Sequence, residues 1–373
     1  MKYSVLFLSL LLITPLLTFS QKSQKEKAYC RFEGNIGSNI NITANLVRLF
    51  EKLSGNYQYR FLDEDAEMYY GKTIEIEGEI TGNDSARLRE FGQKEYTFKG
   101  VMENAVYKGT WYGPAGKTLP FEMKEYYPNG SVQFDVYYLN SEEELVKSDP
   151  KSPTANIELT LLYPNETYFK PFVADSVKNI IVKSFFGSGI QPDDPDTLMV
   201  HFEKEYFDNY TSQNKDWYGK GASFDWEKIK TMSVVYNSGY MLCLEFLTYA
   251  YTGGAHGMTN ISYNIINLDD GQLLTYANVF KEEATDSLSA LLTRQLRKNY
   301  RIPDDVSLKD AGFFVEKVKP NHNIYIDGNG IGFLYNRYEI APYSQGATHI
   351  VLDWPQIRGL LKNDTPVYKL GLR

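Results

Sequence analysis

Between Tyr29 and about Leu139, apolar side chains recur at every second position, and glycines interrupt the pattern at short intervals. A period of two is typical of strands that bury one face, because successive side chains point to opposite sides of a strand. Asn129-Gly130 is typical of a tight hairpin turn. The pattern predicts a small, mostly antiparallel β domain. Within it, the stretch 44–53 has apolar residues at helix spacing and predicts one short helix.

The first 20 residues resemble a secretory signal peptide, with Lys2 before an apolar run from Val5 to Leu17. That run is too short to anchor a protein in a bilayer, and no later segment reaches about 18 uninterrupted apolar residues. We expect cleavage near Ser20. The mature chain is expected to be exported, in the periplasm or outside the cell, without a membrane span.

The composition changes after the first third of the chain. The segment 140–153 loses aromatic residues, gains charge and ends with prolines, which predicts a linker. After it, helix and strand patterns mix without regular alternation, which favours an α+β fold with an antiparallel sheet. Helices are predicted from Pro171, over 198–210, over 286–300 and near 354–361, with hairpin turns at 237–239 and 327–330.

These patterns divide the chain into four parts. We expect a signal peptide in residues 1–20, a mostly β domain of unknown role in 21–148, and two α+β lobes in 152–260 and 261–373.

The overall charge limits the kinds of partner. A formal net charge of −8 argues against nucleic acid or an anionic membrane surface and favours a cationic partner. The 30 tyrosines suit half-buried strands, although sugar-binding proteins use such rings as well. With only two cysteines, a disulfide scaffold is excluded, and Cys243 in an apolar strand is predicted to be a buried small hydrophobe rather than a reactive thiol.

Familiar catalytic motifs are missing from the sequence. A catalytic zinc usually has three protein ligands, but the four histidines are far apart and no HExxH or CxxC occurs. There is no G-x-S-x-G nucleophile motif. Adjacent aspartates, such as Asp269-Asp270, lie next to glycine or proline and are typical of turns. We predict no catalytic residue, no metal and no cofactor.

The run Tyr251-Thr252-Gly253-Gly254-Ala255-His256-Gly257 ends an apolar strand and places three glycines around one histidine. Glycine allows positive φ or a close approach to another group, so the imidazole could be held in a preformed polar pocket. Alternatively, the glycines only turn the chain and His256 bonds to nearby carbonyl groups.

A second run, Tyr338 to Gly346, combines aromatic, acidic and turn-forming residues. It is either a strand end and corner, or a surface that places Glu339 and Tyr343 beside the glycine-histidine turn. The second alternative gives an acidic, aromatic concavity. The candidate ligand- or partner-binding residues are Tyr251, Gly253, Gly254, His256, Glu339 and Tyr343.

The order of these two runs, separated by the polar turn 267–275 and Val279-Phe280, resembles the extracytoplasmic domain shared by RsiV and the N-terminal region of the peptidoglycan deacetylase PdaC. The resemblance covers about residues 155–372. It implies a two-lobed α+β fold, with a second lobe similar to a subdomain of the heat-shock cognate ATPase but without nucleotide hydrolysis. In RsiV this domain binds lysozyme, whereas in PdaC it accompanies a separate deacetylase module.

Two roles of those relatives do not carry over. The sequence shows neither a sigma-binding segment with a membrane helix nor the metal motifs of the deacetylase module. The leading hypothesis is a non-catalytic cell-envelope protein that binds a cationic protein such as lysozyme, or a peptidoglycan fragment. The alternatives are a cell-wall hydrolase or deacetylase that uses His256 with Glu339 or an aspartate, and a structural accessory of a surface assembly.

Overall fold

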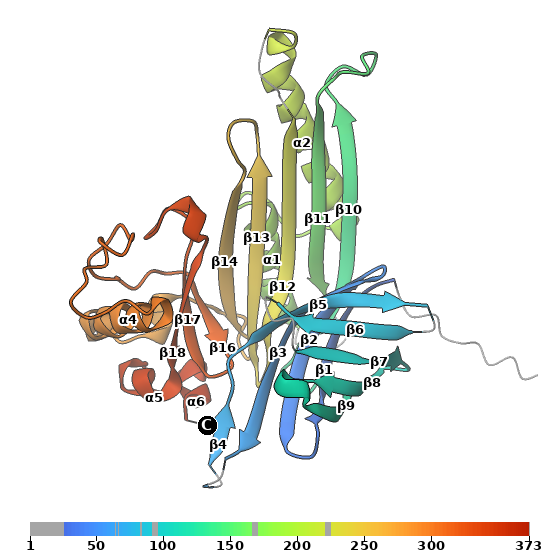
Figure 1. Ribbon diagram of the computed structural model, residues 1–373. Coiled ribbons are helices and arrows are strands. Elements are labelled where there is room, and N and C mark those ends of the chain that lie inside the picture. The colour runs from blue at the N-terminus through green and yellow to red at the C-terminus, as the bar shows by residue number, and fades with distance from the viewer. Residues whose placement is uncertain are drawn as a thin grey trace, which may run out of the picture.

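The computed structural model describes residues 26–372, except 64, 66, 83, 92–95, 166–170 and 221–224. The expected signal peptide lies outside these residues. Three sheets organise the chain: a nine-stranded sheet, a six-stranded sheet at the centre and a three-stranded sheet in the C-terminal part (Figure 1). Helices pack on the second and third sheets, so the expected α+β class, with an N-terminal β domain, is confirmed. In this part of the chain, no helix is both long and apolar enough to cross a bilayer.

The N-terminal sheet closes on itself into a barrel-like domain. Its strands pair antiparallel with their neighbours, β2 pairs with β3, and β1 returns to pair with β9, while β4 pairs only with β3 outside this ring. The strands are β1 (Lys27–Ile36), β2 (Ile40–Leu49), β3 (Lys52–Leu62), β4 (Met68–Tyr70), β5 (Ile74–Thr81), β6 (Ser85–Glu90), β7 (Thr97–Glu103), β8 (Val106–Tyr112) and β9 (Thr118–Glu125), with a 3-10 turn η1 (Pro114–Gly116).

The inward side chains of alternate positions fill this domain, as the period of two predicts. Phe32, Phe98 and Phe121 belong to one buried cluster. Gly100 and Gly109 pair across β7 and β8, and a Cβ atom on either would lie 2.0 or 2.1 Å from a carbonyl oxygen of the neighbouring strand. Glycine at these positions lets the two strands approach closely where the sheet coils.

The helix predicted over residues 44–53 is wrong. These residues form the end of β2, a turn at Phe50 and the start of β3. Phe50 has a φ of 57°, which turns the chain, and its ring is 44% exposed. The apolar residues that mimic a helical stripe in fact belong to two paired strands, and Leu46 and Leu53 both point into the barrel core.

The linker predicted over residues 140–153 is also wrong in part. Residues 140–144 belong to β10 (Phe134–Glu144), which pairs along its length with β11 (Thr154–Pro164). Strand β10 lies at the edge of the central sheet, so Glu142 and Glu144 reach solvent without disrupting the sheet. The chain leaves the first sheet at Glu125 and enters the second at Phe134. The domain limits expected from the sequence remain a prediction.

The central sheet has the order β10-β11-β12-β13-β14-β15 and carries two helices on one face (Figure 1). Its further elements are α1 (Pro171–Phe186), α2 (Pro195–Asn214), η3 (Lys215–Trp217), β12 (Trp226–Ser238), β13 (Met241–Tyr251), β14 (Met258–Asn267) and β15 (Leu273–Leu274). Both helices expected here are confirmed. Each begins at a proline, which suits the first turn of a helix because an N–H group at that position has no acceptor within the helix.

The C-terminal lobe packs α4 against a three-stranded sheet. Its elements are α3 (Tyr276–Val279), η4 (Glu282–Ala284), α4 (Thr285–Tyr300), β16 (Ile324–Asp327), β17 (Gly330–Tyr335), η5 (Tyr343–Gln345), β18 (Thr348–Asp353), α5 (Trp354–Ile357), η6 (Arg358–Leu360) and α6 (Pro366–Leu370). Its core continues onto the second face of the central sheet, where Cys243 is fully buried as a small hydrophobe.

Barrel residues cover part of one edge of β12. Strand β11 pairs with β12 only as far as Thr231, and β12 then continues through a bulge between Val234 and Tyr236. In the part of β12 beyond Thr231, Asn56 donates to the Val234 carbonyl oxygen at 2.7 Å. The barrel thereby supplies hydrogen bonds to a strand edge that the sheet itself leaves unpaired.

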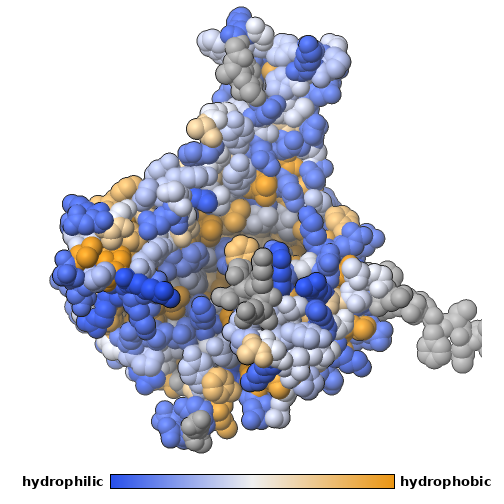
Figure 2. Space-filling view, viewed as in Figure 1, coloured by the Kyte–Doolittle hydropathy of each residue, from blue (hydrophilic) through white to orange (hydrophobic). Residues whose placement is uncertain are grey.

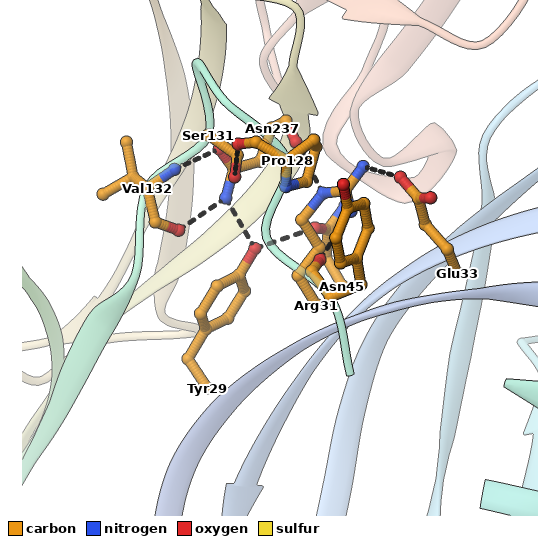
Figure 3. A network of polar contacts seen from close by, with 9 residues as sticks. Tyr29, Arg31, Glu33, Asn45, Pro128, Ser131, Val132 and Asn237 are labelled. Carbon is orange, nitrogen blue, oxygen red and sulfur yellow. Dashed lines mark hydrogen bonds and ion pairs between the residues drawn. The ribbon is translucent and has the colours of Figure 1, made fainter. Parts of the chain in front are cut away.

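Asn237 is the centre of a buried polar network at this junction (Figure 3). Its Nδ2 donates to the Tyr29 hydroxyl at 2.9 Å and to the Val132 carbonyl oxygen at 2.8 Å, and its Oδ1 accepts from the Val132 N–H at 2.8 Å. Arg31, only 1% exposed, donates from Nε to the Asn237 carbonyl oxygen. The network joins the barrel, the crossover segment and β12 into one polar core.

Candidate functional site

The structure brings the two sequence runs together. The His256 ring stacks on the Tyr343 ring, with centroids 3.9 Å apart and planes 25° apart. The Tyr343 hydroxyl donates to the Gly257 carbonyl oxygen at 2.9 Å. His256 Nδ1 bonds to the same carbonyl at 3.1 Å, which places the ring hydrogen on Nδ1. The arrangement is exposed at His256 and half-buried at Tyr343.

Glycine has two different uses in the turn from β13 to β14. Gly253 and Gly254 have φ angles of 93° and 97°, in a region that other residues rarely adopt. Gly257 has ordinary φ, but a Cβ atom there would lie 2.3 Å from the Tyr249 hydroxyl oxygen. Tyr251 closes the turn by donating to the Gly254 carbonyl oxygen at 3.0 Å.

Glu339 takes no part in this stack. Its exposed carboxylate accepts a long hydrogen bond of 3.4 Å from Asn321. Arg337 is the charged residue at Tyr343, with its guanidinium carbon 4.7 Å from the ring centroid. We call the surface formed by His256, Arg337, Tyr338 and Tyr343 the rim.

The rim adjoins a cleft of about 1110 Å³, which we call the central cleft. Arg337 and Thr259 line it near the rim, and the space lies where the three sheets meet. Figure 2 shows the surface hollowed in the middle of this face. Glutamate and aspartate outnumber lysine and arginine in the described lining by five to two, the residues being Glu75, Glu77, Glu245, Asp327, Asp353, Lys72 and Arg337.

Four of these carboxyl groups have raised pKa values, among them Asp353, whose pKa burial raises. Burial raises the pKa of Glu75 on β5. Burial, together with the nearby charge of Glu75, raises the pKa of Glu245 on β13, while a hydrogen bond from the Tyr263 hydroxyl at 2.6 Å opposes that change. Burial raises the pKa of Asp327 to about 6, although hydrogen bonds from backbone N–H groups act to lower it.

An aromatic pair extends from Glu245 toward α4. The Tyr263 and Tyr325 rings lie 4.6 Å apart, and the Tyr325 hydroxyl is 3.3 Å from His349 Nδ1. Burial lowers the pKa of His349, which favours its neutral form. Within the described ranges, no three histidine, cysteine or carboxylate side chains are grouped so that they could hold a metal ion.

The residues of the central cleft were not predicted from the sequence. A signal was present for Glu245, which is a single charge within the otherwise apolar strand Met241-Leu242-Cys243-Leu244-Glu245-Phe246. Glu75 gave no signal, because its alternation with Ile74 and Ile76 is ordinary for a strand with one solvent face.

Fold and site together define an α+β protein whose N-terminal barrel-like domain and two α+β lobes enclose an acidic cleft. Residues 151–259 match the family model described as deacetylase PdaC, and residues 277–355 match the model described as a protein of unknown function, DUF3298. The chain is therefore a PdaC/DUF3298-type domain protein, as the resemblance predicts.

A solved structure has the same fold over part of the chain. This DUF3298 family member from Bacteroides fragilis aligns with a TM-score of 0.61 and 22% identity, covering 66% of this chain and 99% of that one. A DUF3298 family protein from Pseudomonas aeruginosa aligns with a TM-score of 0.45 and 15% identity, over 62% and 95% of the two chains. A comparison with curated proteins found no match.

Proposed function

We propose that this protein is an exported, non-catalytic binding protein of the cell envelope that recognises a cationic protein, of which lysozyme is an example, through the rim. The observation that carries the proposal is the exposed stack of His256 on Tyr343, assembled from two runs about 87 residues apart. Tyrosine and arginine are enriched among the residues that dominate binding energy at protein interfaces.

The charge of the molecule supports this class of partner. A net charge of −8 steers a cationic protein toward the surface, and Glu339 next to Tyr338 is an exposed anion at the rim itself. His256 Nε2 has no hydrogen-bond partner among the described residues, so it can accept a hydrogen bond from a partner.

The rim favours recognition over the hydrolase or deacetylase alternative. An acid–base pair needs the two groups within hydrogen-bond reach of the substrate, directly or through one water. Glu339 bonds to Asn321, and among the described residues it makes neither a hydrogen bond nor an ion pair with His256. No acid–base step through that pair is proposed.

A second candidate partner is a peptidoglycan fragment. The exposed Tyr338 ring, 49% exposed and 5.8 Å from the Tyr343 ring, is an aromatic surface on which a sugar ring could stack.

The test is calorimetric titration of the mature protein with hen lysozyme and, separately, with soluble muropeptides. We expect lysozyme binding that weakens as salt is raised, and a loss of about tenfold or more in affinity in Tyr343→Ala and His256→Ala. His201→Ala is the matched control, because His201 is exposed on α2, away from the rim. Absence of heat with both ligands contradicts the proposal, as does equal binding by the rim variants and the wild type.

A further inference from the structure

Two carboxylates from different sheets line the central cleft. Glu75 lies on β5 of the barrel, Glu245 lies on β13 of the central sheet, and the charge of the first raises the pKa of the second. Two like charges that act on each other each disfavour the ionised form of the other. A cation between them would remove that cost.

The protein supplies no such cation in its described part. The Glu245 carboxylate bonds only to the Tyr263 and Ser233 hydroxyls, at 2.6 and 3.4 Å. The Glu75 carboxylate has neither an ion pair nor a hydrogen-bond partner among the described residues. The charge of Lys72 lowers the pKa values of Glu90 and Asp327 instead, and Arg337 stacks on Tyr343.

A second, independent observation lies on the same wall of the cleft. Thr160 is 4% exposed and lines the cleft, yet its hydroxyl has no hydrogen-bond partner among the described residues. The register places it on the same sheet face as Glu245, because Thr160 pairs with Thr231 and Ser233 pairs with Glu245. An unpartnered buried hydroxyl costs free energy that a polar ligand atom would recover.

We propose that the central cleft binds a small ligand with a protonated amine and a second polar group, with the ammonium between Glu75 and Glu245 and the polar group at Thr160. The site requires the barrel, which lies outside both matched family regions. It is independent of the rim and of the partner proposed for the rim.

The probes are 5-amino-1-pentanol, which carries both groups, 1,5-pentanediol, which is a neutral analogue, and trilysine, which represents a basic protein side chain. Calorimetry of the mature protein is expected to show binding of the amino alcohol and none of the diol. Glu75→Gln and Glu245→Gln are each expected to weaken amine binding about tenfold or more, since each removes one charge-assisted hydrogen bond. Thr160→Val, which keeps the side-chain shape, is expected to weaken it less.

The matched control is Glu77→Gln. Glu77 lines the same cleft, but it is already paired with Arg89 at 2.6 Å, so its replacement should leave amine binding unchanged. In Glu245→Gln the new amide oxygen can still accept from the Tyr263 hydroxyl, so loss of binding in that variant does not require loss of the fold. His256→Ala is expected to keep amine binding even if it abolishes binding of lysozyme.

Affinity should also increase with pH as the two carboxyl groups lose their protons. The other titratable groups that line the cleft are Lys72, Glu77, Asp327, Arg337, His349 and Asp353, and burial favours the neutral form of His349. Three results would overturn the proposal: no binding of the amino alcohol at about 10 mM, equal affinity in Glu77→Gln and Glu245→Gln, or binding of trilysine alone.

Discussion

Arg31 Nε donates to the carbonyl oxygen of Asn237 at 2.7 Å, which joins the first strand of the barrel to a strand 206 residues later in the chain. The same guanidinium donates to the Tyr126 carbonyl oxygen at 2.7 Å and pairs with Glu33. The barrel and the central sheet therefore share one buried cation.

We predict that Arg31→Ala lowers the free energy of unfolding by about 3 to 5 kcal/mol, because it removes the donor from the buried Asn237 carbonyl and the partly buried Tyr126 carbonyl and opens a cavity. Urea unfolding followed by tryptophan fluorescence measures the change. The control is Arg89→Ala, whose side chain is 59% exposed and whose loss should cost less than about 1 kcal/mol. Equal effects of the two substitutions would contradict the buried bridge.

Asp327 joins the third sheet to the barrel and makes stability depend on pH. Its carboxylate accepts from the Thr73 N–H at 3.0 Å, and burial raises its pKa from 3.8 to about 6. A carboxyl with a raised native pKa stabilises the fold fully below its unfolded pKa, and this contribution is lost as pH rises through the native pKa. The loss falls between about pH 4 and pH 6.

We predict that Asp327→Asn, which still accepts from Thr73, removes this dependence. Relative to the variant, the wild type should lose roughly 3 kcal/mol across that window, at about 1.4 kcal/mol for each pKa unit. Denaturant titrations at pH 4, 5, 6 and 7 give the comparison. Parallel curves for the two proteins would show that Asp327 does not titrate as described. Lys72 and Tyr325 lie near the Asp327 carboxyl group and are unchanged in both proteins.

Glu90 is a 6% exposed carboxylate at the barrel core, and the Tyr57 hydroxyl donates to it at 2.6 Å. Burial raises the pKa of Glu90, and the tyrosine opposes that change. Tyr57→Phe should therefore destabilise the protein by about 1 to 3 kcal/mol at pH 7 and by less at pH 4, where Glu90 is protonated.

The comparison for this prediction is Tyr107→Phe. The Tyr107 hydroxyl lies in the same core, but its partners are the backbone carbonyl groups of Ala86 and Phe98, neither of which titrates. The destabilisation caused by Tyr107→Phe should therefore be the same at pH 7 and pH 4. If Tyr57→Phe destabilised the protein equally at pH 4 and pH 7, the result would contradict an ionised Glu90 at pH 7.

The parts of the fold that depend on local pattern could be predicted from the sequence. The alternation of the first third, the helices from Pro171 and over 286–300, and the turn at 327–330 are all confirmed, because each depends on side chains close together in the chain. The closure of β1 onto β9 has no such signal, since it pairs residues about 90 positions apart. The helix predicted over 44–53 is wrong because a turn between two strands places apolar residues at the spacing of a helix.

The candidate site, too, could be predicted only in part from the sequence. The meeting of His256 and Tyr343 was one of two alternatives left open by the sequence, and the structure places them in contact. The same alternative placed Glu339 beside them, whereas Glu339 bonds to Asn321; the left-handed residue Tyr338, at φ 68°, redirects the chain just before it. The role of these residues in binding remains a proposal.

Strand β12 extends beyond its parallel neighbour, and side chains of the barrel cover the remaining part of its edge. An uncovered strand edge readily recruits a strand from another molecule. Removal of the barrel would therefore leave an unpaired strand edge on the two C-terminal lobes, a surface on which strands of other molecules could add.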